Sequence, residues 1–360
     1  MDSLDTRHGR VLLPAFFPDA TYGALRATGF EDAEQAGLMG LVMNAYHLYT
    51  RPGASVIKRM GGLHAFTGWD RTLLTDSGGF QLFSLIRENP AYGEIRDNEI
   101  IFRPAQDGKK VIFTPEKCIQ AQVKYGSDIL MALDMCTHPD DPPPVQRRSV
   151  ELTVKWAARC KAEFLKLTRN DPHPPKLFGI VQGGGSRELR MECGQRLAGI
   201  GFDGYGFGGW PLDSRGNFRP DILQWACDAM PQGAVKYAMG LGKPEEIVLL
   251  TDMGYTLFDC VIPTREARHN RLYVFRPGYE DPEKLRGERF YTYHYALDDK
   301  HLADKRPVDE HCTCPLCRRY SRGYLHHLLK IGDAQAMRLA TAHNLRFYAR
   351  LMELLQAGRG

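Results

Sequence analysis

Short apolar runs recur along the chain, and each ends at a polar residue, a glycine or a proline. They lie at residues 11–17, 38–43, 72–74, 129–133, 177–181, 202–207, 237–239 and 256–262. Runs of this length are typical of strands that are buried on both faces, as in a parallel sheet. Stretches with helical spacing separate several of them, at residues 150–167, 186–198 and 244–252. Eight strands alternating with helices predict a (β/α)8 barrel, with a doubly wound sheet as the alternative.

Polar or small residues follow the ends of these runs. They are Asn44, Asp76, Asp134, Gln182, Gly208, Gly209, Gly240 and Asp259. The carboxyl ends of the strands of a barrel open onto one face, where active sites are built. These residues are therefore expected to meet at one mouth, where three carboxylates and two amides would suit a planar, polar ligand. Each residue alone also fits an ordinary polar loop.

Asp259 lies inside the last apolar run, which passes through Pro263 into a basic segment with Arg265 and Arg268. A carboxylate in an apolar run is costly to bury unless it has a partner or a chemical task. It could brace a strand end in an ion pair or act in catalysis, and ion pairs are the commoner use. The number of polar strand ends in this chain favours catalysis.

Asp76 opens a second candidate motif, in which Ser77, Gly78, Gly79 and Phe80 follow it directly. The two glycines allow a tight turn and the close approach of a ligand to the backbone. Phe80 offers a ring on which a planar ligand can stack. A plain turn uses the same residue types, so the motif gains weight only together with the other strand ends.

The composition is that of a folded globular protein. Of 360 residues, 43% are hydrophobic and 25% are charged, which argues against the disordered and membrane classes. No apolar stretch approaches the roughly 20 residues that span a bilayer. The amino terminus has no basic region followed by an apolar core, so no secretory signal is expected. The net charge of +4 is too small to indicate a partner.

The cysteines indicate a reducing compartment and one metal site. Six of the nine are scattered, whereas Cys312, Cys314 and Cys317 form a Cys-x-Cys-x-x-Cys cluster. Thiolates at this spacing suit structural, tetrahedral zinc. The fourth ligand must come from elsewhere, and the spacing leaves four candidates open: His311, His326, His327 and His343.

Several motifs together resemble those of bacterial tRNA-guanine transglycosylases, the queuine tRNA-ribosyltransferase family. They are DSGGFQ at 76–81, SDILMALDMCT at 127–137, LFGIVQGG at 177–184, MGLGKPEEI at 239–247, FDCVIPTR at 258–265 and the cysteine cluster. The resemblance extends from about residue 44 to residue 343. It implies a (β/α)8 barrel at residues 1–275, followed by a zinc-binding subdomain with a C-terminal helix at 276–360. It also implies exchange of guanine at the wobble position of a tRNA anticodon for a 7-deazaguanine, in the queuosine pathway.

The resemblance assigns two catalytic carboxylates. Asp259 matches the nucleophile that attacks the anomeric carbon of the ribose and forms a covalent glycosyl-aspartate, as in retaining glycosidases. Asp76 matches the acid and base that protonates the departing guanine and deprotonates the incoming base.

The resemblance also assigns binding residues. Asp134 matches the acceptor for the N–H groups of the base, and Gln182 and the Gly209 backbone match contacts to its carbonyl oxygen. The remaining substrate-binding positions are Asn44, Ser77, Phe80, Gly208, Trp210 and Met239. Arg265 and Arg268 would hold phosphates of the anticodon loop. The zinc ligands implied are Cys312, Cys314, Cys317 and His343.

One loop departs from the family pattern. After the two glycines, bacterial members usually continue Leu-Ala-Val-Gly-Glu, whereas this chain has Trp210, Pro211, Leu212, Asp213 and Ser214. Pro211 has no N–H, so the backbone there cannot present a donor, although the Trp210 carbonyl can accept. The incoming base is therefore left open among the aminomethyl precursor, the nitrile precursor and queuine.

The resemblance further implies a homodimer that acts on tRNA with a GUN anticodon. The cysteine usage predicts the cytoplasm, and the lack of a long apolar stretch predicts no membrane contact. Two alternatives are kept: a non-catalytic partner subunit of such an enzyme, and exchange of the same bases into DNA. The presence of both Asp76 and Asp259 argues against the first. The complete cysteine cluster and the FDCVIPTR motif favour tRNA over DNA.

Overall fold

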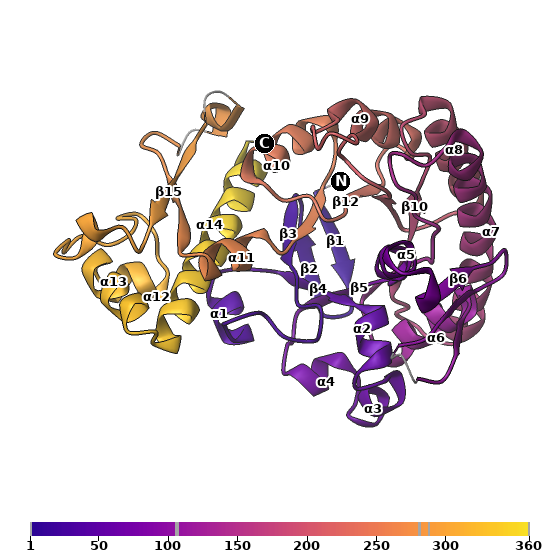
Figure 1. Cartoon of the computed structure of the whole chain (residues 1–360), viewed down its shortest axis with the longest axis horizontal. Coiled ribbons are helices and arrows are strands. Elements are labelled where there is room, and N and C mark those ends of the chain that lie inside the picture. The colour runs from indigo at the N-terminus through magenta and orange to yellow at the C-terminus, as the bar shows by residue number, and fades with distance from the viewer. Residues whose placement is uncertain (1, 105–107, 280–281, 287–288, 359–360) are drawn as a thin grey trace.

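The protein is described from a computed structural model that covers residues 2–104, 108–279, 282–286 and 289–358. Eight parallel strands form one sheet in the order β3-β13-β12-β11-β10-β9-β5-β4. A parallel bridge between Asp19 and Val42 joins the two ends, so the sheet is a nearly closed barrel. Helices surround it, and the C-terminal elements project from one side (Figure 1). The predicted barrel is confirmed.

The barrel strands lie close to the predicted runs. They are β3 (Ala15–Pro18), β4 (Gly40–Asn44), β5 (Thr72–Asp76), β9 (Ile129–Met131), β10 (Lys176–Val181), β11 (Gly204–Phe207), β12 (Val235–Ala238) and β13 (Leu257–Cys260). The first run differs from its prediction, because β3 begins only at Ala15 and Val11 belongs to an outer hairpin of β1 (Ser3–Thr6) and β2 (Gly9–Leu12).

Large and small side chains alternate inside the barrel. Phe17 lies where a Cβ on Gly40 would come within 2.3 Å of its ring, and Phe178 stands in the same relation to Gly204, at 2.5 Å. Glycine on one strand thus makes room for phenylalanine on another, which fills the interior at ordinary packing density.

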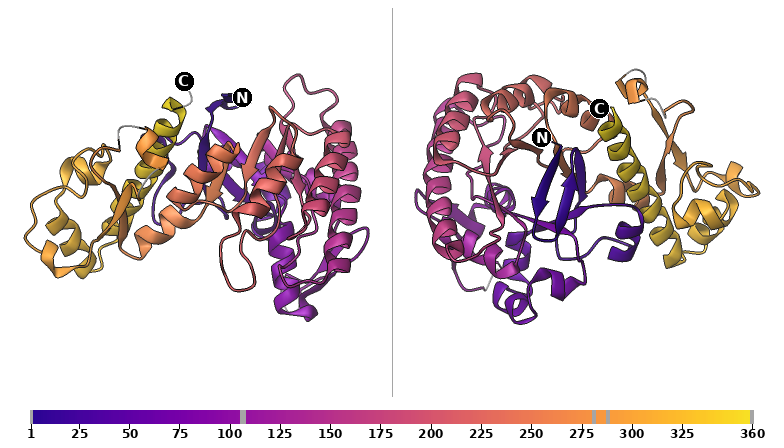
Figure 2. Two further views of the ribbon diagram at one scale, coloured as in Figure 1. Left: turned by 90° about the horizontal axis from the view of Figure 1, so that it is seen from above. Right: turned by 180° about the vertical axis from the view of Figure 1, so that it is seen from behind.

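The β1–β2 hairpin lies across one end of the barrel (Figure 2). His8 in its turn contacts Asp128, which directly precedes β9, with 2.8 Å between Nδ1 and Oδ1. His64 lies 3.3 Å from the same carboxylate, but its Nε2 also lies 3.0 Å from the Arg71 carbonyl, and the two imidazoles are stacked at 3.5 Å. These contacts hold the hairpin and His64 against Asp128 at the base of the barrel.

The outer helices follow the strands in chain order. They are α1 (Phe30–Gln35), α2 (Ala45–Thr50), α3 (Ala54–Arg59), α4 (Leu63–Thr67), α5 (Gly79–Glu88), α6 (Pro115–Tyr125), α7 (Pro143–Thr168), α8 (Arg187–Ile200), α9 (Pro220–Ala229), α10 (Pro244–Met253) and α11 (Ile262–Arg268). A small sheet of β6 (Gly93–Ile95), β7 (Ile100–Phe102) and β8 (Val111–Phe113) is inserted before α6. None of the helices in the described ranges is long and apolar enough to cross a bilayer.

The C-terminal part begins with the hairpin of β14 (Arg271–Phe275) and β15 (Tyr291–Tyr295), followed by α12 (Pro315–Arg319), α13 (Arg322–Lys330) and α14 (Ala334–Ala357). α14 is anchored to the barrel, because Tyr348 donates to the Gly242 carbonyl at 2.7 Å and Arg338 pairs with Asp32 at 2.8 Å. The division into units at residue 275 stays a prediction.

Candidate active site at the mouth of the barrel

The predicted site residues meet at the carboxyl ends of the strands. Asn44 and Asp76 are paired as the last residues of neighbouring strands, and Asp259 lies near the end of β13. Asp134 stands three residues beyond β9, next to Ser77 and Gln182. Local sequence spacing alone could not show which of these side chains touch.

Asp76 is held by three donors. Its Oδ2 accepts from Asn44 Nδ2 at 2.8 Å, and its Oδ1 accepts from the backbone N–H groups of Ala45 at 3.2 Å and Gly78 at 3.1 Å. Burial in the mouth raises the pKa of Asp76 to about 7, and the charge of Asp259 adds to the increase. A carboxyl group with this pKa can both give and take a proton near neutral pH.

Only one of the two carboxylate oxygens of Asp259 accepts hydrogen bonds from the part of the chain that the structure describes. Its Oδ1 accepts from the Tyr237 hydroxyl at 2.7 Å and from the Gly240 N–H at 2.7 Å. Its Oδ2 has no hydrogen-bond donor among the described residues, so its lone pairs are available to a ligand. Burial raises the pKa of Asp259 to about 6. The group is therefore a carboxylate at neutral pH, fixed in direction and poorly solvated, which suits a nucleophile.

Asp134 is almost completely buried, with an exposed fraction of 6%. Its Oδ2 accepts from Gln182 Nε2 at 2.6 Å, and its Oδ1 accepts from the Ser77 hydroxyl at 3.4 Å. Burial raises the pKa of Asp134 to about 6. Gln182 Oε1 is buried and has no partner among the described residues, so this pair has hydrogen-bonding capacity left for a ligand.

We expect Asp134→Asn to stabilise the fold at pH 8. Because the pKa is about 6 in the folded protein and 3.8 in the reference state, the folded state favours the protonated form. The contribution of this group to the free energy of unfolding is therefore fully present below about pH 4. About 3 kcal/mol of it is lost as the pH rises through 6. Asparagine carries no charge and avoids this loss.

Thermal unfolding at pH 8 and near pH 4 measures the effect. The midpoint of the variant should rise by several degrees at pH 8 and stay close to that of the unchanged protein at the lower pH. An equal shift at both pH values would contradict the assignment to this carboxyl group.

The glycines beside Gln182 keep the mouth open. A Cβ on Gly208 would come within 2.5 Å of Gln182 Nε2, and one on Gly206 within 2.8 Å of Met239 Sδ. Met239 lies in the turn just beyond β12 and packs against the interior cluster that contains Tyr237. Phe80 is 42% exposed and lies against Trp210, with 5.4 Å between ring centroids. The mouth thus has apolar side chains around a carboxylate and amide floor.

Two residues that support the site, Tyr237 and Arg190, could not be recognised from the sequence pattern. Tyr237 sits inside an apolar run, where a tyrosine is unremarkable, yet its hydroxyl orients Asp259. Arg190 on α8 is fully buried and has no carboxylate partner among the residues that the structure describes. Its NH1 donates to the carbonyls of Val181 and Gly208 at 2.7 Å each. Arg190 therefore ties together the strand ends that carry Gln182 and Gly209.

Arg265 and Arg268 lie on the last turn of α11, the helix that directly follows Asp259. Both are exposed, and neither forms an ion pair within the part of the chain that the structure describes. Arg268 Nε donates to the Thr264 carbonyl at 3.1 Å, which leaves its terminal nitrogens free to meet an anion.

The cysteine cluster is completed by His343. The four ligand atoms of Cys312, Cys314, Cys317 and His343 lie within 4.8 Å of one another, and His343 Nδ1 is 3.2 Å from Cys317 Sγ. His343 Nε2 lies 2.7 Å from the Tyr273 carbonyl, an arrangement that leaves Nδ1 to face the thiols. Three thiolates and one imidazole fit tetrahedral zinc, and His326 is instead beside Asp299.

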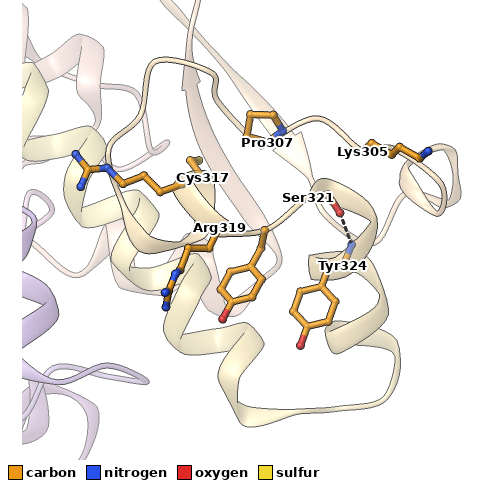
Figure 3. Close-up of a pocket in the computed structure, with 8 residues that line it drawn as sticks. Lys305, Pro307, Cys317, Arg319, Ser321 and Tyr324 are labelled. Atoms are coloured by element: carbon orange, nitrogen blue, oxygen red, sulfur yellow. Dashed lines mark hydrogen bonds between the residues drawn. The ribbon is translucent and has the colours of Figure 1, made fainter.

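A surface hollow of about 490 Å³ lies beside this cluster. Its lining includes Cys317, Arg319 and Tyr324, which come from α12 and α13 (Figure 3). All the residues that line it lie between positions 305 and 324, so neither Asp76 nor Asp259 contributes to it.

Comparison with known proteins gives one consistent family. The model of the family described as queuine tRNA-ribosyltransferase matches residues 1–357. The queuine tRNA-ribosyltransferase of Caldanaerobacter subterraneus subsp. tengcongensis is 40% identical over 354 residues, which cover 98% of this chain and 88% of that protein. That of Methylacidiphilum infernorum is 39% identical over 362 residues, with coverage of 98% and 89%. That of Shewanella halifaxensis is 39% identical over 351 residues, with coverage of 97% and 86%.

Proposed function

The chain belongs to the queuine tRNA-ribosyltransferase family, and on this premise we propose that it replaces guanine in a tRNA anticodon with a 7-deazaguanine. The observation that carries the proposal is Asp259, a carboxylate with one oxygen fixed by two donors and the other without a donor among the described residues. It shares the mouth with Asp76, whose raised pKa suits proton transfer. The two carboxyl groups divide nucleophilic and acid–base work between them.

The reaction proceeds in two displacements. Asp259 Oδ2 attacks the anomeric carbon, the bond from that carbon to N9 of guanine breaks, and Asp76 supplies a proton to the departing base. The ribose is then held as an ester of Asp259. The N9 atom of the incoming base attacks the same carbon, displaces the carboxylate and gives its proton to Asp76, so the enzyme returns to its starting state.

The floor of the mouth recognises the base. Asp134 accepts from the N–H groups of the Watson–Crick edge. Gln182 Nε2 gives one hydrogen to Asp134, and its second N–H and the Gly209 N–H donate to the carbonyl oxygen of the base. Phe80 and Met239 supply apolar contact to the two faces of the ring. A wobble base can reach this floor because it leaves the stack of a single-stranded loop at low cost.

The pH profile of exchange is expected to be bell-shaped. Activity requires Asp259 without its proton, so it rises as the pH passes about 6, and it requires Asp76 with its proton, so it falls above about 7. The measurement is kcat/KM for guanine exchange as a function of pH. Because the Tyr237 hydrogen bond lowers the pKa of Asp259, Tyr237→Phe should move the acidic limb to higher pH, and an unmoved limb would contradict this assignment.

Arg265→Ala and Arg268→Ala are each expected to weaken tRNA binding and to flatten its salt dependence. One phosphate contact contributes roughly one unit to the slope of log K against log salt. Binding measured at several salt concentrations tests this. Arg169→Ala is the matched control, since Arg169 caps the carboxyl end of α7 and precedes the amino end of β10, whereas the mouth lies at the carboxyl ends of the strands. A reduction of the slope by the control alone would exclude the α11 arginines as phosphate ligands.

We also propose that the protein is a homodimer in the cytoplasm. The dimer rests on the family, and sedimentation would give twice the chain mass of 40.7 kDa if it is correct. The compartment rests on the cysteines, because none of the nine forms a disulfide and reduced cysteines persist in reducing surroundings.

The decisive assay supplies labelled guanine and a tRNA with a GUN anticodon. Incorporation of label supports base exchange, and chase with each 7-deazaguanine identifies the incoming base. A silent partner subunit would bind tRNA without incorporation. Incorporation into DNA but not into tRNA would establish the alternative of base exchange into DNA.

A further inference from the structure

Trp210 carries a buried hydrogen-bond donor that no described residue satisfies. Its indole Nε1 is shielded from solvent and has no acceptor within the described ranges. The two fully buried tryptophans behave differently, because Trp69 Nε1 donates to the Thr72 carbonyl at 3.1 Å and Trp156 Nε1 to the Asp97 carbonyl at 2.9 Å. A buried N–H without an acceptor is unfavourable, so a site that retains one is prepared for an acceptor from outside.

The indole stands at the junction of three loops of the mouth. Trp210 directly follows Gly208 and Gly209 at the end of β11. Its ring lies 5.4 Å from that of Phe80 and 5.3 Å from that of His138, which stand beyond the ends of β5 and β9. The indole therefore lies at the rim of the mouth, beside the Phe80 ring that is proposed to contact the base.

The residue after Trp210 has no backbone donor. Pro211 has no N–H, and its carbonyl already accepts from the Arg219 N–H at 2.8 Å. The loop beyond is braced by Asp213, whose Oδ1 accepts from the N–H groups of Arg215 at 2.9 Å and Asn217 at 2.8 Å. A braced loop holds the indole in place before a base arrives.

We infer that the Trp210 indole N–H donates to an acceptor on the ring substituent of the incoming 7-deazaguanine. The substrate class is then a 7-deazaguanine whose substituent carries a nitrile nitrogen or a hydroxyl oxygen. A substituent whose only polar group is an ammonium is disfavoured, because its N–H donors would face the N–H donor of the indole. This inference rests on the proposed function and specifies the substrate of the same site.

The test compares KM and kcat for guanine, the aminomethyl base, the nitrile base and queuine. It uses the unchanged protein, Trp210→Phe and Trp225→Phe. The phenylalanine at 210 keeps an aromatic ring against Phe80 and His138 but removes the N–H. Trp225 is a partly buried residue of α9 outside the mouth and serves as the matched control. Calorimetric binding of the four bases to the unchanged protein gives a second measurement that needs no variant.

The inference predicts that the nitrile base or queuine has the lowest KM and Kd. Trp210→Phe should raise the KM for that base about tenfold more than the KM for guanine, with a smaller change in kcat, and Trp225→Phe should leave the ratio unchanged. Comparison of the nitrile base with queuine shows whether the acceptor is a nitrile nitrogen or a hydroxyl oxygen. Equal losses for all bases, or tightest binding of the aminomethyl base, would overturn the inference. Absence of guanine exchange by the unchanged protein would instead overturn the proposed function.

Discussion

Asp259→Asn is expected to lower guanine exchange by about 10⁴-fold or more, with the fold and tRNA binding retained. The variant keeps an oxygen that can accept from Tyr237 and Gly240, so the local structure has no reason to collapse. It lacks the anionic oxygen that is proposed to form the bond to the anomeric carbon. Loss of a covalent nucleophile removes the whole two-step path, which accounts for the size of the effect.

Asp203→Asn is the matched control for this change. Asp203 immediately precedes β11, at the opposite end of the barrel from the mouth, and its carboxylate accepts from the Leu177 N–H at 2.9 Å. Asparagine can keep that bond, so exchange should continue at the unchanged rate. Exchange by Asp259→Asn at more than a few per cent of the original rate would contradict the role of Asp259.

Removal of zinc is expected to unfold the C-terminal subdomain. Cys314 is both a proposed ligand and the N-cap of α12, and its side chain is buried. Structural zinc sites of this kind contribute about 10–16 kcal/mol of apparent binding free energy, which becomes folding free energy. Cys314→Ser should therefore lose the metal and show a separate unfolding transition at low temperature.

Metal content and thermal unfolding, each with and without a chelator, check this prediction. Cys227→Ser is the matched control, because Cys227 donates to the Met253 carbonyl at 3.0 Å and serine can donate in the same place. The control should keep its zinc. A Cys314→Ser protein with full zinc content and an unchanged melting profile would show that the cluster does not hold the metal.

The barrel could be predicted because its strands are buried on both faces. Such strands read as continuous apolar runs, and the residue that ends each run marks the mouth, as Asp76 and Asn44 do. An apolar run does not show where the chain leaves one sheet and enters another. Residues 11–17 read as one strand, yet Val11 pairs with Leu4 in the outer hairpin and Ala15 pairs with Leu257 in the barrel.

Contacts between distant strands were beyond the sequence pattern. Tyr237 and Asp259 meet only because β12 and β13 are neighbours in the barrel. His343 completes the zinc cluster because α14 returns past Cys317, and the spacing by itself left three other histidines open. The sequence pattern predicts Arg190 to be an exposed charge on a helix. The structure buries it, because α8 packs where Arg190 can donate to carbonyls at the ends of β10 and β11.

The central claim is that Asp259 carries the ribose of tRNA as a covalent ester. The most direct measurement quenches the protein with tRNA and an incoming base under denaturing conditions, followed by mapping of any RNA-linked peptide. The account predicts a protein–tRNA adduct on the peptide that contains Asp259, and none with Asp259→Asn. Base exchange that proceeds without an adduct, or an adduct mapped to Asp76, would contradict it.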